Sequence, residues 1–210
     1  MNIAILSINI YVVFTLLFFI IKHFKYDMDS VEENDTSWMV YYFIIAFFIL
    51  LIQNTYYGTL NEGEQKCVVQ PLSIFIYTIM PLCLIMGPII IFLVKMNWNR
   101  IFANTFGLLL APNIELSTGQ HTKSLFFYND PNILLQEIDP KILFNKTDLI
   151  SKLSTLLGEP VDITPEQHKV IVRQYKTKQN VGYFIWLTLT GIVTSLVSSN
   201  SILLQECIIE

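Results

Sequence analysis

The chain has 210 residues, of which 53% are hydrophobic and 14% are charged, and its formal net charge is −4. Soluble domains carry about 25% charged residues, so this composition excludes an ordinary soluble protein and indicates an integral membrane protein. The small net charge favours no class of charged partner, and we expect no nucleic-acid partner.

Four apolar runs are long enough to cross a bilayer, which takes roughly 20 mainly apolar residues. They predict transmembrane helices at about residues 3–21, 38–56, 72–94 and 181–204. The first run could instead be a cleaved signal peptide, but a signal peptide carries its basic residues before the apolar run. Here Lys22 and Lys25 follow the run, which favours a retained span.

The basic residues are unevenly distributed over the segments between the spans. Twelve of the 13 Lys and Arg residues lie in segments 22–37 and 95–180, and only Lys66 lies elsewhere. Because Lys and Arg accumulate on the cytoplasmic side of membranes, we expect both segments to be cytoplasmic and both termini to be lumenal or exterior. Glycosylation of either N-x-S/T site, Asn34 or Asn145, would overturn this orientation.

Two spans have features that bear on transport. The third contains Pro81 and Pro88, and each removes a backbone donor and kinks a helix. Transporters break helices in this way, but the span contains no charged residue, which favours prolines tolerated by helix packing. The fourth span is rich in Thr and Ser, which predicts close packing at the centre of the bundle, with a polar conduit as the alternative. Asn9 in the first span is expected to make an interhelical hydrogen bond.

The segment 98–110, which follows the third span, is predicted to lie at the membrane surface. Trp98 and Arg100 suit the headgroup level, and Phe102 and Phe106 recur at helical spacing. This pattern favours a short interfacial helix that anchors the chain, with a re-entrant segment as the alternative.

Segment 113–180 is the only part able to form a small cytoplasmic subdomain. A helix is expected to begin near Thr147 and to stop at Gly158. Thr164, Pro165 and Gln167 form a capping box that starts a second helix. Nothing breaks this second helix before residue 204, so about forty residues should run on as the fourth span and project from the bilayer.

The organisation that we predict follows from these elements. Three spans and the interfacial helix occupy residues 1–112, the subdomain 113–180, the fourth span 181–204 and a short tail 205–210. The fold class is therefore an all-α membrane protein with a small cytoplasmic helical subdomain and a long, projecting fourth helix. Candidate partner-docking residues in the subdomain are Phe126, Phe127, Tyr128, Lys169 and Arg173, and Lys176 and Lys178 should add to the same basic surface.

Signals of catalysis are sparse. The three histidines have no metal-ligand spacing to a Cys or to one another, and His168 should be solvated. No nucleophile elbow, Walker loop, Rossmann turn or zincin helix occurs. The segment 180–184 is similar to a potassium-channel filter, but it lies inside the predicted long helix rather than in a loop. We expect no enzyme activity, no metal and no cofactor.

Two of the three cysteines fall on the predicted lumenal face. Cys67 precedes the third span and Cys207 follows the fourth. They could form a disulfide that ties these span ends together if their Cα atoms approach within about 7 Å in an oxidising compartment. Two free thiols are the other outcome, and the sequence leaves both open.

Two segments together resemble a protein family. Trp98-Asn-Arg-Ile-Phe-Ala-Asn-Thr-Phe-Gly107 follows a span, and Tyr128-Asn-Asp-Pro-Asn-Ile-Leu-Leu-Gln-Glu-Ile138 follows about twenty residues later. The pair resembles multi-span virion membrane or minor capsid-associated proteins of large icosahedral double-stranded DNA viruses. The resemblance implies a location in the bilayer beneath the capsid, and it carries over no functional residue.

Two functions from different classes follow. The leading hypothesis is a non-enzymatic structural protein of a viral internal membrane, which links the bilayer to a capsid or assembly partner. The alternative is a small channel or transporter that uses the Pro-containing third helix and the Ser/Thr-rich fourth helix. A membrane-bound enzyme ranks third. The expected partners are lipid and the capsid or other membrane proteins, and the sequence leaves the oligomeric state open.

Overall fold

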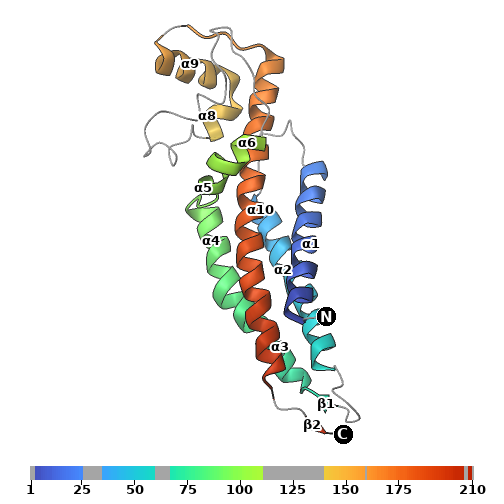
Figure 1. Cartoon of the computed structure of the whole chain (residues 1–210). Coiled ribbons are helices and arrows are strands. Elements are labelled where there is room, and N and C mark those ends of the chain that lie inside the picture. Colours follow the sequence, from blue (N-terminus) through green and yellow to red (C-terminus); the bar gives the residue numbers. More distant parts are fainter. Residues whose placement is uncertain are drawn as a thin grey trace. The chain divides into compact units, whose positions relative to one another are not determined.

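A computed structural model describes residues 3–25, 35–59, 67–110, 140–158, 160–205 and 208–209. Apart from two short strands, the elements in these ranges are helices (Figure 1). Four helical stretches within them are long and apolar enough to cross a membrane. This confirms the predicted class, an all-helical protein with four candidate spans.

The first two spans are single helices, α1 (Ile3–Lys25) and α2 (Asp35–Gly58). Both run a few residues past the predicted apolar cores, because the polar residues at their ends are compatible with a helix. On α1 the buried residues, mostly three or four positions apart, fall on one side of the helix, as expected for a helix with one packed face. They are Ser7, Tyr11, Thr15, Phe18, Phe19 and Lys22.

The third span remains helical through both prolines. It consists of α3 (Pro71–Pro81), the π-helical turn η1 (Leu82–Met86) and α4 (Gly87–Lys95). In η1 the backbone N–H of Gly87 donates to the Leu82 carbonyl, five residues back. A π turn is one of the ways in which a helix accommodates local strain. The two prolines therefore flank a π turn, and neither interrupts the helical run.

A tight bend follows the third span. Asn97 has a φ of 55°, in the left-handed region that Asn tolerates better than most residues. The helical run after the bend comprises α5 (Arg100–Phe102), the π turn η2 (Ala103–Gly107) and α6 (Leu108–Leu110). This run coincides with the helix predicted for segment 98–110.

Among the residues described after position 139, three helices follow: α8 (Pro140–Phe144), α9 (Lys146–Leu157) and α10 (Pro165–Leu203). Asn145 caps α9 by accepting a 3.1 Å hydrogen bond from the Thr147 N–H. Gly158 ends α9 with a φ of 71°, in the left-handed region, as predicted.

The long helix starts and continues as its sequence predicts. The Thr164 N–H donates to Gln167 Oε1 at 2.9 Å, and the Gln167 N–H donates to Thr164 Oγ1 at 3.2 Å. These reciprocal bonds are the predicted capping box. From Pro165 onwards α10 is one uninterrupted helix of 39 residues.

Two short strands join distant parts of the chain. β1 (Cys67–Val68) pairs antiparallel with β2 (Ile208–Ile209), and Cys67 stands opposite Ile209. The backbone just before the third span is thereby hydrogen-bonded to the chain that follows α10. Cys207 lies outside the described residues, so the possible disulfide between Cys67 and Cys207 stays open.

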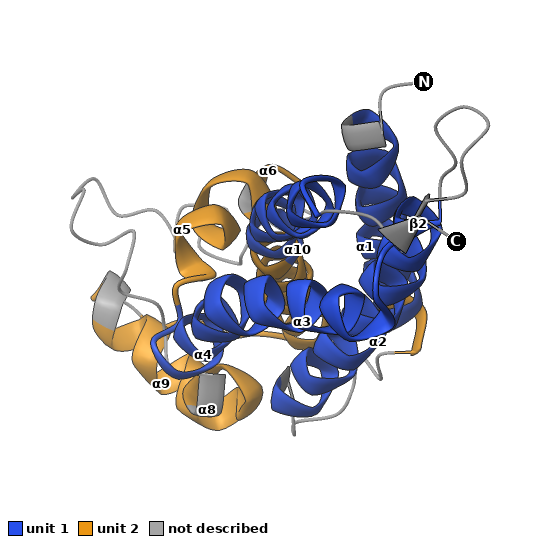
Figure 2. Ribbon diagram, turned by 90° about the horizontal axis from the view of Figure 1, so that it is seen from below, with its two compact units in different colours: residues 1–22, 34–97, 184–210 blue, residues 23–33, 98–183 orange. Residues whose placement is uncertain are grey.

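The chain divides into two compact units, coloured separately in Figure 2. Unit 1 comprises residues 1–22, 34–97 and 184–210, and unit 2 comprises residues 23–33 and 98–183. Helix α10 contributes residues to both. Segment 98–110 groups with unit 2 and not with the first three spans. The reason is its close packing on α10, described below.

Candidate functional site

Unit 1 contains buried polar side chains that come from all four span-length helices. We call this set the polar network. Its members share hydrogen bonds or van der Waals contact at helix–helix interfaces, and they are Ser7, Tyr11, Thr15, Tyr42, Gln53, Asn54, Tyr57, Thr78 and Ser198.

Tyr11 links α1 to two other helices of the network. Its hydroxyl lies 2.8 Å from the Tyr42 hydroxyl of α2, and it donates to Met86 Sδ of η1 at 3.7 Å. Thr15 Oγ1, one turn further along α1, lies 2.9 Å from the same Tyr42 hydroxyl. Tyr11 and Tyr42 are both fully buried, so these bonds satisfy groups that would otherwise be costly in an apolar bundle.

Gly191 of α10 provides the space for the Tyr11 ring. A Cβ atom at Gly191 would overlap the ring, and Tyr11 Cδ1 would lie only 2.7 Å away. Real Cβ atoms do not approach other atoms this closely, so the position requires glycine for steric reasons. Tyr11 thus brings α1 into contact with α2, η1 and α10.

Asn54 joins three helices. Its Nδ2 donates to Thr78 Oγ1 of α3 at 2.8 Å and to Ser198 Oγ of α10 at 2.6 Å. Ser198 Oγ in turn donates to the Tyr77 carbonyl at 2.9 Å. Hydrogen bonds between membrane helices stabilise their association by about 0.6–2 kcal/mol each. The network therefore stabilises the association of the helices in unit 1.

A second group of polar contacts joins α1 to α2. Ser7 Oγ donates to the Tyr57 hydroxyl at 2.8 Å, and Gln53 Nε2 donates to the same hydroxyl at 3.1 Å. Three buried polar atoms of unit 1 have no hydrogen-bond partner among the described residues: Gln53 Oε1, Thr188 Oγ1 and Ser195 Oγ. A polar passage through unit 1 would be lined by unpaired polar atoms of this kind.

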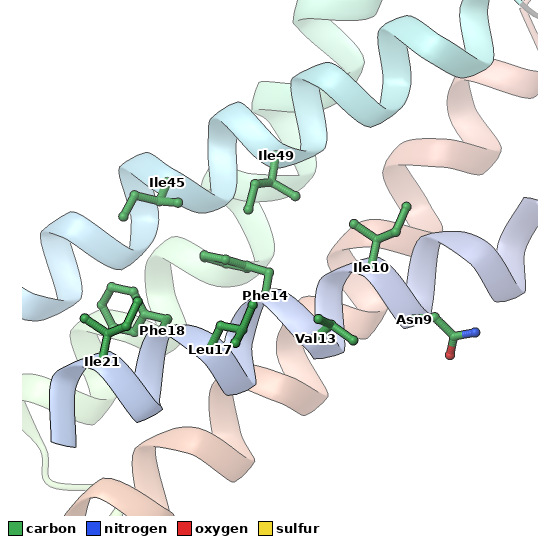
Figure 3. A pocket seen from close by; sticks show the side chains of 9 residues that line it. All are labelled: Asn9, Ile10, Val13, Phe14, Leu17, Phe18, Ile21, Ile45 and Ile49. Carbon is green, nitrogen blue, oxygen red and sulfur yellow. The ribbon is translucent and has the colours of Figure 1, made fainter. Parts of the chain in front are cut away.

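An apolar groove of about 550 Å³ lies along α1 and α2 (Figure 3). Its lining is hydrocarbon except for one amide, and it consists of Asn9, Ile10, Val13, Phe14, Leu17, Phe18, Ile21, Ile45 and Ile49. Asn9 is exposed, and no hydrogen bond joins it to any residue that the structure describes. The expected interhelical bond of Asn9 is therefore not made within the described chain.

In unit 2, segment 98–110 packs against α10 through two glycines. A Cβ at Gly107 would lie 2.6 Å from the Lys178 carbonyl oxygen and 2.8 Å from Lys178 Cα. A Cβ at Gly182 would overlap the Asn99 carbonyl oxygen and lie 3.0 Å from Ala103 Cβ. Both contacts are with backbone or a short side chain, which cannot move aside as a flexible side chain could.

Polar bonds reinforce this packing. Lys178 Nζ donates to Asn104 Oδ1 at 2.7 Å, and Asn99 Nδ2 donates to Gln179 Oε1. These contacts, together with the two glycine contacts, explain why segment 98–110 belongs to unit 2.

Two lysines predicted to lie on a basic surface are buried. Lys176 and Lys178 are both 0% exposed, so the prediction is wrong for them. The Lys176 ammonium lies 5.5 Å from the centroid of the Phe144 ring, and the Lys178 ammonium lies 5.3 Å from that of the Tyr175 ring. Cations stabilised by aromatic faces and amide oxygens can be buried. Lys169 and Arg173 of the predicted surface are exposed.

Unit 2 has a hydrophobic core of its own. Its buried members come from α8, α9, the following loop and the first half of α10, and they are Leu143, Leu149, Leu153, Val161, Ile163, Ile171 and Tyr175. His168 was expected to be solvated, and this is wrong: its ring is half-buried and Nε2 lies 3.0 Å from the Leu143 carbonyl oxygen. His168 thereby joins α10 to α8.

The remaining predicted site residues have different outcomes. Trp98 and Phe106 are exposed, at 39% and 53%, and the Phe106 ring lies 6.1 Å from that of half-buried Phe102. Arg100 begins α5. Phe126, Phe127 and Tyr128 lie outside the described residues, and so does Cys207.

The sequence predictions missed the polar network, although one signal for it is visible. Ser7, Tyr11 and Thr15 are spaced four residues apart in an otherwise apolar run, so they share one helix face. No group of three His, Cys, Asp or Glu side chains able to hold a metal occurs among the described residues.

Comparison with protein-family models, with curated proteins and with solved structures gave no significant match. A proposal for the function therefore rests on the contacts described above.

Proposed function

We propose that the chain is a non-enzymatic structural membrane protein whose unit 2 binds a capsid or other assembly partner at the cytoplasmic face of a viral internal membrane. One observation carries this proposal. A single uninterrupted helix, α10, supplies Ile171 and Tyr175 to the core of unit 2 and Thr194 and Ser198 to the interior of unit 1. Unit 2 and the bundle of candidate spans in unit 1 thus share one helix.

The polar network supports a structural role for the bundle. The Asn54 amide and the Tyr11 and Tyr42 hydroxyls hydrogen-bond to groups on neighbouring helices. Groups committed in this way hold helices together and are not free to solvate a passing ion.

Unit 2 supplies the surface for a partner. Its own core allows it to keep a defined shape, and Lys169 and Arg173, one turn apart on α10, are exposed. Two adjacent cations favour a partner with an acidic patch, because complementary charge steers association and fixes its register. The resemblance of segments 98–107 and 128–138 to virion membrane proteins supports the viral internal membrane as the location.

Reversing the exposed charges of α10 tests the docking role. We expect Lys169→Glu with Arg173→Glu to reduce incorporation of the chain into purified particles at least tenfold, because like charges would then face an acidic partner. The matched control is Lys152→Glu on α9, which is also exposed and should change incorporation less than twofold. The measurement is quantitative mass spectrometry of purified particles, with the level of the chain in host membranes as reference.

Equal incorporation of the charge-reversed protein and the control would contradict docking through α10. Normal levels of both variants in host membranes would show that neither change prevents folding or insertion.

A channel or transporter is the second candidate, and one observation favours it. The Ser195 and Thr188 hydroxyls of α10 are buried and have no hydrogen-bond partner among the described residues, as the lining of a narrow polar passage would. A structural protein should leave an ion gradient intact, so we expect proteoliposomes of the full chain to release K⁺ no faster than empty vesicles. Flux above this background that Ser195→Ala abolishes would favour the channel instead.

A further inference from the structure

One face of α1 is exposed and carries a regular pattern. Val13, Leu16 and Ile20 are 54%, 46% and 41% exposed, and Asn9 is exposed one turn before Val13. We call these four residues the Asn9 seam. Their spacing of four, three and four residues is that of the apolar seam between two helices that coil around each other.

The seam lies on the opposite side of α1 from the residues packed inside unit 1. Ser7, Tyr11 and Thr15 are buried, and at 3.6 residues per turn they point away from Asn9 and Val13. None of the four seam residues therefore takes part in the polar network. The seam therefore stays exposed in unit 1, although Asn9 and Val13 also line the groove along α1 and α2.

Asn9 makes this face unsuited to lipid alone. Asn9 lies inside the predicted span, about 9 Å along the helix axis from Ile3. Figure 3 places its side chain at one end of the groove, with the amide pointing away from the apolar residues. Among the described residues no partner satisfies this amide, and lipid chains offer none.

An amide has both a donor and an acceptor, so a second Asn satisfies it. Copies of one chain inserted in the same orientation present their α1 helices parallel, and a two-fold axis along the membrane normal then brings Asn9 opposite Asn9. A single Asn in such a seam specifies register and oligomeric state, and within a membrane its hydrogen bond across the helices adds to their association. We propose that the chain forms a dimer through the Asn9 seam, with Asn9 hydrogen-bonded to Asn9 of the second copy.

This inference adds to the proposed function and does not depend on it, because a monomer could still dock a partner through unit 2. The test uses the full chain, carrying one dye on a C-terminal tag, in phosphatidylcholine bilayers at a series of protein-to-lipid ratios. Photobleaching steps of single particles give the dimer dissociation constant.

We expect the fraction of particles that bleach in two steps to increase with the protein-to-lipid ratio. Asn9→Leu should raise the dissociation constant about tenfold, which corresponds to ~1.4 kcal/mol, near the upper range for one interhelical polar contact. Leu16→Ala should raise it severalfold. Leu17→Ala is the matched control, since Leu17 is similarly exposed, at 53%, but lies outside the seam.

Single-step bleaching of the wild-type chain at every density would overturn the proposal, and so would an unchanged dissociation constant for Asn9→Leu. A lipid retained by the monomer in native mass spectrometry, together with single-step bleaching, would identify lipid as the occupant of this face. Melting temperatures of the variants in detergent should stay close to that of the wild type, because no seam residue is buried inside unit 1, and this separates lost association from lost folding.

Discussion

Replacing Gly191 by alanine is expected to destabilise unit 1 by about 3 kcal/mol, at the upper end of the range for overpacking a well-filled core. The new Cβ would overlap the Tyr11 ring, which is fully buried. A displaced ring loses its contacts with the Tyr42 hydroxyl and Met86 Sδ as well. The measurement is the free energy of unfolding of the full chain in mixed micelles.

The chain offers a matched control in the same bundle. A Cβ at Gly87 meets only the Leu82 carbonyl oxygen, at 4.0 Å, so Gly87→Ala should leave stability unchanged or raise it slightly. Combining Gly191→Ala with Tyr11→Ala should cost less than the sum of the single changes, because the smaller side chain frees the space that alanine needs. Equal losses for Gly191→Ala and Gly87→Ala would contradict the central position of Tyr11.

The second large effect is expected in unit 2. Gly107→Ala with Gly182→Ala should separate segment 98–110 from α10, because both new Cβ atoms would overlap backbone atoms of the opposing segment. We expect the backbone amides of residues 100–110 to exchange with solvent at least tenfold faster, measured by hydrogen exchange of the full chain in detergent. A tenfold change corresponds to ~1.4 kcal/mol of local stability.

Thr105→Ala provides the comparison within the same segment. Thr105 is exposed, and its hydroxyl donates to the Ile101 carbonyl at 2.8 Å inside the same helical run. This change should affect exchange less than twofold, because it alters no contact with α10. If the amides of residues 100–110 exchange at the same rate in the double glycine variant as in Thr105→Ala, glycine packing does not hold segment 98–110 against α10.

The local signals in the sequence predicted the helices well. Long apolar runs located four span-length helices, and the capping box at Thr164 and Gln167 located the start of α10. Gly158 marked the end of α9. These features depend on residues within one or two turns of each other, so the sequence alone is sufficient to predict them.

The candidate site depends on residues far apart in the chain. Nothing near Gly191 indicates that Tyr11 will occupy its space, and nothing near Asn54 indicates Ser198. Lys176 and Lys178 were assigned to the surface from their charge, but contacts with Phe144 and Asn104 stabilise them in the interior. Long-range packing of this kind cannot be read from periodicity.

The direct test of the proposed structural role is the copy number of the chain in purified virus particles, before and after the capsid shell is removed. The proposal predicts a constant ratio of the chain to the major capsid protein in intact particles and retention of the chain with the internal membrane once the shell is gone. Presence of the chain in host-cell membranes but not in purified particles would contradict it.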